Sequence, residues 1–230
     1  MKRGMLLLSV LSLLLIGPAP AANAAVAGTT SAASAVLYPD CRDVPVSYSF
    51  QPTPDVSHWN MDIDVLAPDG TTDGSAFLSS FFDAPTGSFT IQLCGSVSMP
   101  GTWTVTGTGE YEGADDITHT WQLTPSVFNV RAANTRTTLS KKPVGRGVYS
   151  LRVSVKDERP NGYYDTDYPE VVIQRMDHGK WRRVPGVSVS VSDGKGSVRV
   201  SVKSIVKVRA VTSADSNYSS STSRPVTLRP

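Results

Sequence analysis

The three histidines are the residues best suited to move protons at neutral pH, and their positions follow no known catalytic spacing. His58 lies in a Ser-His-Trp segment, His119 continues the apolar alternation of Ile117 and Trp121, and His178 lies in an Asp-His-Gly turn. The sequence has no Gly-x-Ser-x-Gly elbow, no His-Glu-x-x-His motif, no glycine-rich phosphate loop and no Cys/His metal spacing. We therefore expect a protein that is not an enzyme, with His119 in a core.

Four aspartates offer the oxygen ligands that Ca²⁺ prefers. Asp62 and Asp64 share one face of an expected strand, and Asp69 and Asp73 lie in the Pro-Asp-Gly-Thr-Thr-Asp-Gly segment that follows. Their spacing is not that of an EF-hand loop, and Asp-Gly is ordinary turn chemistry, so the alternative is a set of solvated acids. Apart from a Ca²⁺ site at these four residues, we expect no cofactor.

The two cysteines, Cys41 and Cys94, predict one disulfide, because an even pair in an exported protein is oxidised. The bond would close a loop of about 54 residues, for which the chain-entropy model gives about 4 kcal/mol of stabilisation. The alternative is a pair of buried free thiols.

The first 24 residues have the pattern of a secretion signal. Lys2 and Arg3 precede an apolar run over Met5–Ile16, and Ala22-Asn23-Ala24 is a small-residue cleavage site. The apolar run is about twelve residues long, too short for the ~20 residues of a membrane-spanning helix. We expect a signal peptide over residues 1–24 and a secreted, extracellular protein with no membrane span.

The charges divide the rest of the chain into two halves of opposite sign. Residues 25–130 carry one Arg against twelve Asp and Glu, a net charge of −11, and residues 131–230 carry nineteen Lys and Arg against eight Asp and Glu, a net charge of +11. Such an asymmetry favours two modules of opposite net charge.

Apolar residues alternate with polar ones throughout both halves, as in Val44, Val46, Tyr48 and Phe50 and again over residues 149–155. A period of two predicts strands that bury one face, which is typical of antiparallel sheets. The predicted fold class is all-β, with two tandem antiparallel β-sandwich domains. The predicted divisions are a signal peptide at 1–24, a flexible segment at 25–35, an acidic sandwich with one disulfide at 36–130, a linker at 131–135 and a basic sandwich at 136–230.

Short motifs in each half resemble known exported domains. In the acidic half, Gly87-Ser-Phe-Thr-Ile-Gln-Leu and Pro100-Gly-Thr-Trp-Thr-Val resemble strand pairs of exported sandwich domains. In the basic half, Val171-Val-Ile-Gln-Arg, Trp181-Arg-Arg-Val, a Gly-rich turn and a late Arg-Ala strand precede a Ser/Thr-rich tip. This order resembles the immunoglobulin-like repeat domains of exported actinobacterial proteins over residues 136–229. The resemblance implies an immunoglobulin-like sandwich for that half.

Residues 157–170 are longer and more aromatic than the corresponding connection of such repeats. Tyr163, Tyr164 and Tyr168 lie in this segment and could stack on sugars or anchor a protein partner. The alternative is that the three rings fold back over the sandwich edge. We expect Trp181 to fill the core across from Val171 and Ile173.

Basic residues alternate with apolar ones on several strands of the second half, so we expect them to form a surface. They are Arg152, Lys156, Arg175, Arg182, Arg199, Lys203, Lys207 and Arg209. With the three tyrosines, Arg182, Arg199 and Lys203 are the predicted binding residues.

The expected partners are an anionic cell-wall polymer or polysaccharide, or an extracellular protein. Nucleic acid is not expected, because few aromatic residues accompany the cations. The opposite charges also permit head-to-tail self-association or docking of the two halves on one another.

Three functions follow from these observations. The first is a secreted, non-catalytic binding or structural protein that acts at an extracellular surface through oppositely charged sandwiches. The alternative is a secreted inhibitor or effector that presents a loop, Asn161–Tyr168, to a protein partner. The third is a hydrolase of unknown substrate, because a catalytic triad or a carboxylate pair is defined by geometry and not by sequence spacing.

Overall fold

The computed structural model describes residues 28–52, 56, 58–113, 117–215 and 218–230, and over these residues every regular element is a strand. The prediction of an all-β fold built as sandwiches is confirmed. The predicted signal peptide, residues 1–24, lies outside the described residues.

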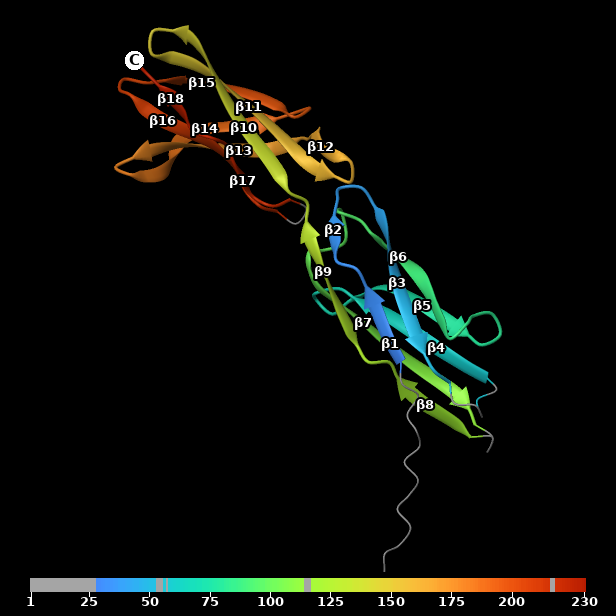
Figure 1. The fold of residues 1–230 in the computed structure, drawn as a ribbon. Coiled ribbons are helices and arrows are strands. Elements are labelled where there is room, and N and C mark those ends of the chain that lie inside the picture. The colour runs from blue at the N-terminus through green and yellow to red at the C-terminus, as the bar shows by residue number, and fades with distance from the viewer. Residues whose placement is uncertain (1–27, 53–55, 57, 114–116, 216–217) are drawn as a thin grey trace, which may run out of the picture.

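The first half forms a sandwich, called here the acidic sandwich, of a three-stranded and a six-stranded sheet (Figure 1). Its strands are β1 (Gly28–Ala32), β2 (Ala35–Leu37), β3 (Arg42–Phe50), β4 (His58–Leu66), β5 (Thr72–Ser79), β6 (Thr86–Leu93), β7 (Gly101–Glu112), β8 (Thr118–Gln122) and β9 (Ser126–Ala132). The smaller sheet has the order β1-β3-β6, and the larger has the order β2-β9-β7-β4-β5 with β8 also paired to β7. The predicted antiparallel pairing has one exception, because β2 pairs with β9 in parallel.

The second half forms another sandwich, the basic sandwich, which buries its own separate core. Its strands are β10 (Thr135–Gly145), β11 (Val148–Arg159), β12 (Gly162–Asp165), β13 (Tyr168–Asp177), β14 (Lys180–Val191), β15 (Lys195–Ser201), β16 (Val206–Thr212), β17 (Ser221–Thr222) and β18 (Val226–Leu228). One sheet contains β10, β11, β12 and β15, and the other contains β14, β13, β16, β17 and β18. Leu151, Ile173 and Leu228 are completely buried between them.

The predicted flexible segment at 25–35 is wrong for residues 28–35, which form β1 and the start of β2. Gly28 opens β1 at a point of close approach, since a Cβ there would lie 2.3 Å from the Leu123 side chain and 2.7 Å from Phe50 Cβ. The segment is rich in Gly, Thr and Ser and carries little apolar periodicity, so its sequence gives no strand signal. Residues 25–27 lie outside the described residues.

The break between the two halves lies within the predicted linker at 131–135 but is shorter, because the strands continue almost to the boundary. β9 ends at Ala132, β10 begins at Thr135, and Ala133 between them is fully buried. The carbonyl of Ala133 accepts a hydrogen bond of 2.8 Å from the Ser219 amide, which ties the junction to the basic sandwich.

The two sandwiches meet end to end, and ion pairs join them at the junction (Figure 1). Nη1 and Nη2 of the Arg131 guanidinium each donate to a Glu158 carboxylate oxygen at 2.8 Å. These hydrogen bonds lower the pKa of Glu158 to about 2. Arg159 of β11 pairs with Asp40 of the acidic sandwich. Among the described residues, the ion pairs between the halves lie at their ends, and the broad sheet faces do not dock on one another.

Two aromatic predictions are wrong, because neither Trp181 nor His119 lies in a core. Trp181 is half-buried on the outside of its sheet, where the Arg209 guanidinium lies 4.4 Å from its ring centroid. The β13–β14 register shifts between Val172 and Gln174, and an odd shift moves side chains to the opposite face. His119 is half-buried beside Tyr111, with ring centroids 5.0 Å apart, rather than inside the core.

Candidate polyanion-binding face

The outer surface of the β10–β11–β15 sheet is covered by hydroxyl and cationic side chains. Along β11, Leu151, Val153 and Val155 point into the core, so the residues between them must face solvent. The same alternation holds on β10 and β15. We define the basic face as the outward residues of these three strands: Arg136, Thr138, Ser140, Lys142, Ser150, Arg152, Ser154, Lys156, Lys195, Ser197, Arg199 and Ser201.

The strand register arranges these residues in rows across the sheet. Arg152 lies between Ser140 and Ser197, and Ser150 lies between Lys142 and Arg199. Adjacent rows are about 7 Å apart along a strand, and adjacent strands are about 4.8 Å apart. Cations therefore recur across and along the face, with hydroxyl groups between them that can donate hydrogen bonds to an anion.

A shallow hollow of about 540 Å³ lies on this face. Arg152 and Lys195 provide its charge, and Thr138, Ser140, Ser154 and Ser197 provide hydroxyl groups. Its walls carry no acidic side chain. Such a surface can hold a phosphate, sulfate or carboxylate by charge-assisted hydrogen bonds.

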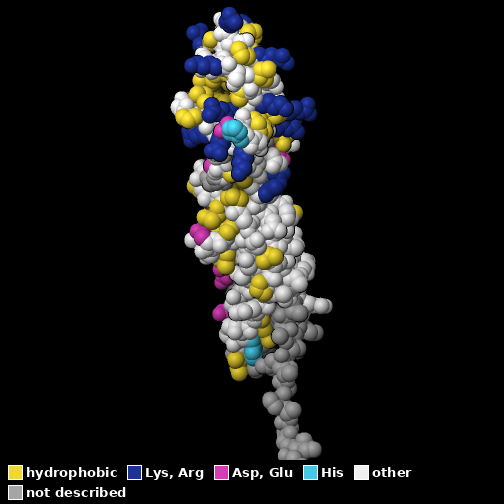
Figure 2. Space-filling view, turned by 90° about the vertical axis from the view of Figure 1, so that its left-hand side faces the viewer, with side chains coloured by type: hydrophobic (Ala, Val, Ile, Leu, Met, Phe, Trp, Pro, Cys, Tyr) yellow, Lys and Arg dark blue, Asp and Glu magenta, His cyan; other side chains and the backbone are white. Residues whose placement is uncertain are grey.

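The charges at the centre of the basic face are not neutralised. Among the described residues, no carboxylate forms an ion pair with Lys142, Arg152, Lys195 or Arg199, whereas Lys156 lies 3.3 Å from Asp165 at the edge. Lys and Arg side chains gather on the basic sandwich, as Figure 2 shows for one side of the molecule. The surface potential of this half is therefore positive.

The opposite sheet carries cations that are paired with acids or stacked on a ring. Arg182 lies 3.4 Å from Asp177, and Arg183 pairs with Glu170. Arg209 donates to Gln174 at 2.8 Å and lies over Trp181. These three cations of the opposite sheet therefore have polar or aromatic partners, which the central cations of the basic face lack among the described residues.

The structure does not bring the three predicted binding cations together. Arg199 lies on the basic face, Arg182 lies on the opposite sheet beside Asp177, and Lys203 lies in the connection after β15. Lys142 and Lys195 of the basic face are not among the predicted binding residues. The signal that would have found them is the shared alternation of Ser, Thr, Lys and Arg with apolar residues in the three segments 136–142, 150–156 and 195–201.

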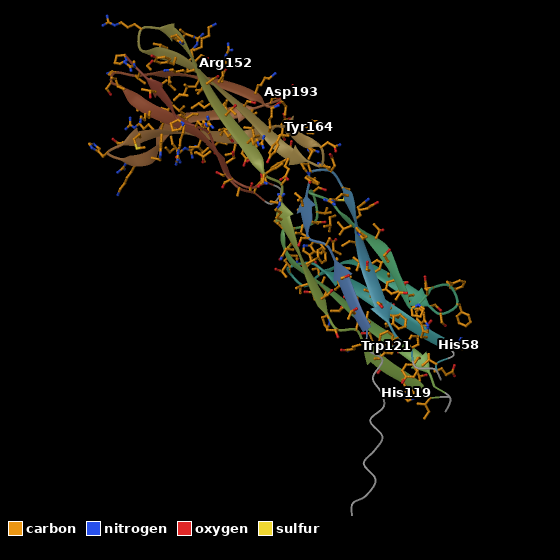
Figure 3. The ribbon with its side chains drawn as sticks, viewed as in Figure 1. His58, His119, Trp121, Arg152, Tyr164 and Asp193 are labelled. Atoms are coloured by element: carbon orange, nitrogen blue, oxygen red, sulfur yellow. A yellow bond between two sulfur atoms is a disulfide. The ribbon has the colours of Figure 1, made fainter. Side chains whose placement is uncertain are left out.

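The predicted tyrosine site is also dispersed. Tyr168 is 5% exposed, its hydroxyl donates to the Ser213 carbonyl, and burial raises its pKa, so it is a core residue and not a contact residue. Tyr163 is half-buried, with the Arg136 guanidinium 3.6 Å from its ring centroid. Only Tyr164 is largely exposed, on the β12 strand that faces the junction (Figure 3). Within residues 157–170, the end of β11 and β12 form a hairpin, and Tyr168 begins β13 of the other sheet.

The predicted calcium site is not assembled. Among the described residues, no three His, Cys, Asp or Glu side chains lie close enough to hold a metal ion. Asp62 and Asp64 are on β4, whereas Asp69 accepts hydrogen bonds from Thr71 and Asp73 accepts one from Ser98. The hydrogen bonds from Thr71 lower the pKa of Asp69, as expected for a turn aspartate.

The predicted disulfide is confirmed. Cys41 and Cys94 are bonded, with their sulfur atoms 2.03 Å apart, and they join the start of β3 to the end of β6. Over the described residues, no helix has the length and apolar character that a membrane crossing needs.

Comparisons with known proteins add little to this geometry. No protein-family model matches the chain, and no curated protein sequence matches it. A solved structure described as bearing on host cell surface retention of a 1.5-MDa bacterial ice-binding adhesin aligns with 87% of this chain at 10% identity and a TM-score of 0.32. The alignment covers 63% of that other chain. A TM-score this low indicates no shared fold or function.

Proposed function

We propose that this is a secreted, non-catalytic protein that binds an anionic extracellular polymer through the basic face. The observation that carries the proposal is the unpaired state of Lys142, Arg152, Lys195 and Arg199 on one hydroxyl-lined sheet face. Unpaired cations on an exposed surface attract polyanions and release their counterions on binding.

The shape of the face favours a polymer over a small anion. The hollow is shallow, and its cations are spread over three strands instead of converging on one point. Lys195 and Arg199 are four residues apart on β15, which corresponds to about 13 Å along the strand. A chain of phosphate or carboxylate groups can contact both ends of this span at once, whereas a single anion cannot.

We propose that the polymer is bound outside the cell. The disulfide is of the kind that persists in oxidising compartments, and the first 24 residues predict export. Anionic wall polymers and acidic polysaccharides are the polyanions of that setting. Hydroxyl groups that alternate with the cations suit a polymer that carries both anions and sugar hydroxyls.

Titration of the mature protein with long-chain inorganic polyphosphate, followed by calorimetry, tests the proposal. Four cations that each contact one phosphate predict a slope near −3 for the logarithm of affinity against that of salt, at about −0.7 per contact. Between about 50 and 200 mM NaCl, the affinity should therefore fall about 60-fold. Neutral dextran of similar length is the control and should not bind. A salt-independent affinity, or equal binding of dextran, would refute the proposal.

A further inference from the structure

The turn between β5 and β6 exposes two phenylalanine rings at one end of the molecule. Phe81 is 69% exposed and Phe82 is 91% exposed. Exposed apolar rings side by side mark interaction sites more often than isolated ones do. We define the aromatic tip as Phe81, Phe82 and the adjacent Asp83.

Hydrogen bonds hold this turn in one conformation. The Ser79 carbonyl accepts from the amides of Phe82 at 2.9 Å and Asp83 at 2.8 Å, and the Asp83 carboxylate accepts from the Ser79 amide at 3.0 Å. Ser80 exchanges backbone and side-chain hydrogen bonds with Trp59 of β4. The hydrogen-bonded turn therefore presents the rings to solvent. Because the turn backbone is already ordered, binding a partner costs little conformational entropy.

The aromatic tip lies at the end of the acidic sandwich that is remote from the junction. β3 begins beside Asp40, which contacts Arg159 of the basic sandwich, and it ends at Phe50. The Phe50 amide donates to the Pro85 carbonyl, which directly follows the tip, at 3.0 Å. His58 stacks on Phe81 with ring centroids 4.9 Å apart, and its labelled position in Figure 3 marks this end of the molecule.

The opposite end of the molecule carries an apolar pocket with a cationic rim. It has a volume of about 350 Å³, within the range of small binding pockets. Ile173, Val208 and Leu228 form part of its apolar wall, and the exposed Arg175 and Lys203 also line it. We define the end pocket as these residues with Val184, Val200, Ser201, Val202, Ser204 and Val206.

The strand register places this end pocket far from the junction. β11 reaches the junction at Arg159 and begins at Val148, which pairs with Ser201 on the rim of the pocket. The aromatic tip and the end pocket therefore lie at opposite ends of two sandwiches joined end to end (Figure 1).

We propose that the aromatic tip of one copy of this chain inserts into the end pocket of the next copy. The chemistry of the two sites is complementary: apolar rings beside Asp83 in the half of charge −11 meet an apolar pocket rimmed by Arg175 and Lys203 in the half of charge +11. The contact uses different surfaces on the two copies, so it is heterologous and propagates into linear chains of molecules. Ser201 borders both surfaces, but the contact uses none of the cations of the basic face, which lies along the side of the basic sandwich.

Sedimentation velocity on the mature protein tests the contact over about 10 µM to 1 mM, the range suited to a small interface. The native protein should form species that grow with concentration. A tip variant, Phe81→Ser with Phe82→Ser, should associate at least about tenfold more weakly. A control variant, Val97→Ser with Val127→Ser, removes two exposed apolar side chains elsewhere on the acidic sandwich and should associate as the native protein does.

Two pocket variants report on the other side of the contact. Val184→Trp fills the end pocket, and Arg175→Glu with Lys203→Glu reverses its rim charge at exposed positions where folding is not at risk. Each should be monomeric. A mixture of the tip variant with a pocket variant should form a one-to-one dimer that does not grow, because only one intact tip and one intact pocket remain. A native protein that stays monomeric at all concentrations, a tip variant that still forms chains, or a mixture that stays monomeric would overturn the proposal.

Discussion

A variant that loses three charges from the basic face, Arg152→Gln with Lys195→Gln and Arg199→Gln, is expected to bind polyphosphate about 100-fold more weakly than the native protein at low salt. A cation near an anionic surface contributes about 1 kcal/mol, and 3 kcal/mol corresponds to about two orders of magnitude in affinity. The three side chains are solvated and form no ion pair with the described residues, so their loss leaves no buried charge. The melting temperature should therefore hardly change. Calorimetric titration and thermal unfolding measure the two quantities on the same sample.

A matched variant on the opposite sheet distinguishes binding at the basic face from a general effect of net charge on affinity. Lys180→Gln with Arg182→Gln and Lys207→Gln removes the same net charge from exposed positions. Charges more than about one Debye length from the polymer, ~8 Å at physiological salt, are largely screened. At physiological salt, this variant should bind within about threefold of the native protein. Equal weakening in both variants would mean that net charge, and not the basic face, attracts the polymer.

The second large effect is expected from Arg159→Gln, which should lower the free energy of unfolding by about 3–5 kcal/mol at pH 7. Asp157 has no exposed side-chain surface, and Arg159 Nε lies 2.7 Å from its Oδ2 atom. The other oxygen of Asp157 is buried and accepts no hydrogen bond from the described residues. Without Arg159, a buried carboxylate loses its cation, and the junction loses the ion pair with Asp40. Differential scanning calorimetry of the native and variant proteins measures the loss.

The pH dependence of this loss identifies its cause. Burial raises the pKa of Asp157 above its ordinary value, although Arg159 opposes the shift. A carboxyl group with a raised folded pKa destabilises the fold above that pKa and ceases to do so as the pH falls towards its unfolded value. Removal of Arg159 raises the folded pKa further, so the deficit of the variant should be largest near pH 7, shrink as the pH falls through the raised folded pKa, and be nearly gone below about pH 4. A double variant, Asp157→Asn with Arg159→Gln, should lose less than Arg159→Gln alone. A deficit that is independent of pH and unchanged in the double variant would contradict this explanation.

Period-two alternation predicts those strands that bury one face in apolar residues. The rule applies directly to β3, whose buried residues are the apolar ones of the sequence pattern, and to β11 except for the buried Asp157. It failed for Trp181, because the β13–β14 register shifts along β14 between this residue and the buried Val189. The shift places the Trp181 ring on the outer face of the sheet. It failed for β1 because Thr30 is buried in a strand of small polar residues, which a search for apolar alternation does not detect.

The site was harder to predict than the strands because it depends on which strands become neighbours. Ser140, Arg152 and Ser197 are far apart in the sequence, and only the pairing of β11 with both β10 and β15 places them in one row. Likewise, a carboxylate cluster that looks compact along the chain, such as Asp62 to Asp73, is divided between two strands and a turn. Sequence spacing indicates which residues face outward, but it does not indicate which of them meet.

The most direct measurement is the rate at which each lysine is acetylated in the presence and absence of polyphosphate, followed by mass spectrometry of the peptides. If the polymer lies along the β10–β11–β15 sheet, Lys142 and Lys195 should react several-fold more slowly when it is bound. Lys180, Lys203 and Lys207, which are exposed elsewhere on the basic sandwich, should react at unchanged rates. Protection of all five lysines alike, or of Lys180 and Lys207 without Lys142 and Lys195, would contradict the assignment of the binding surface to the basic face.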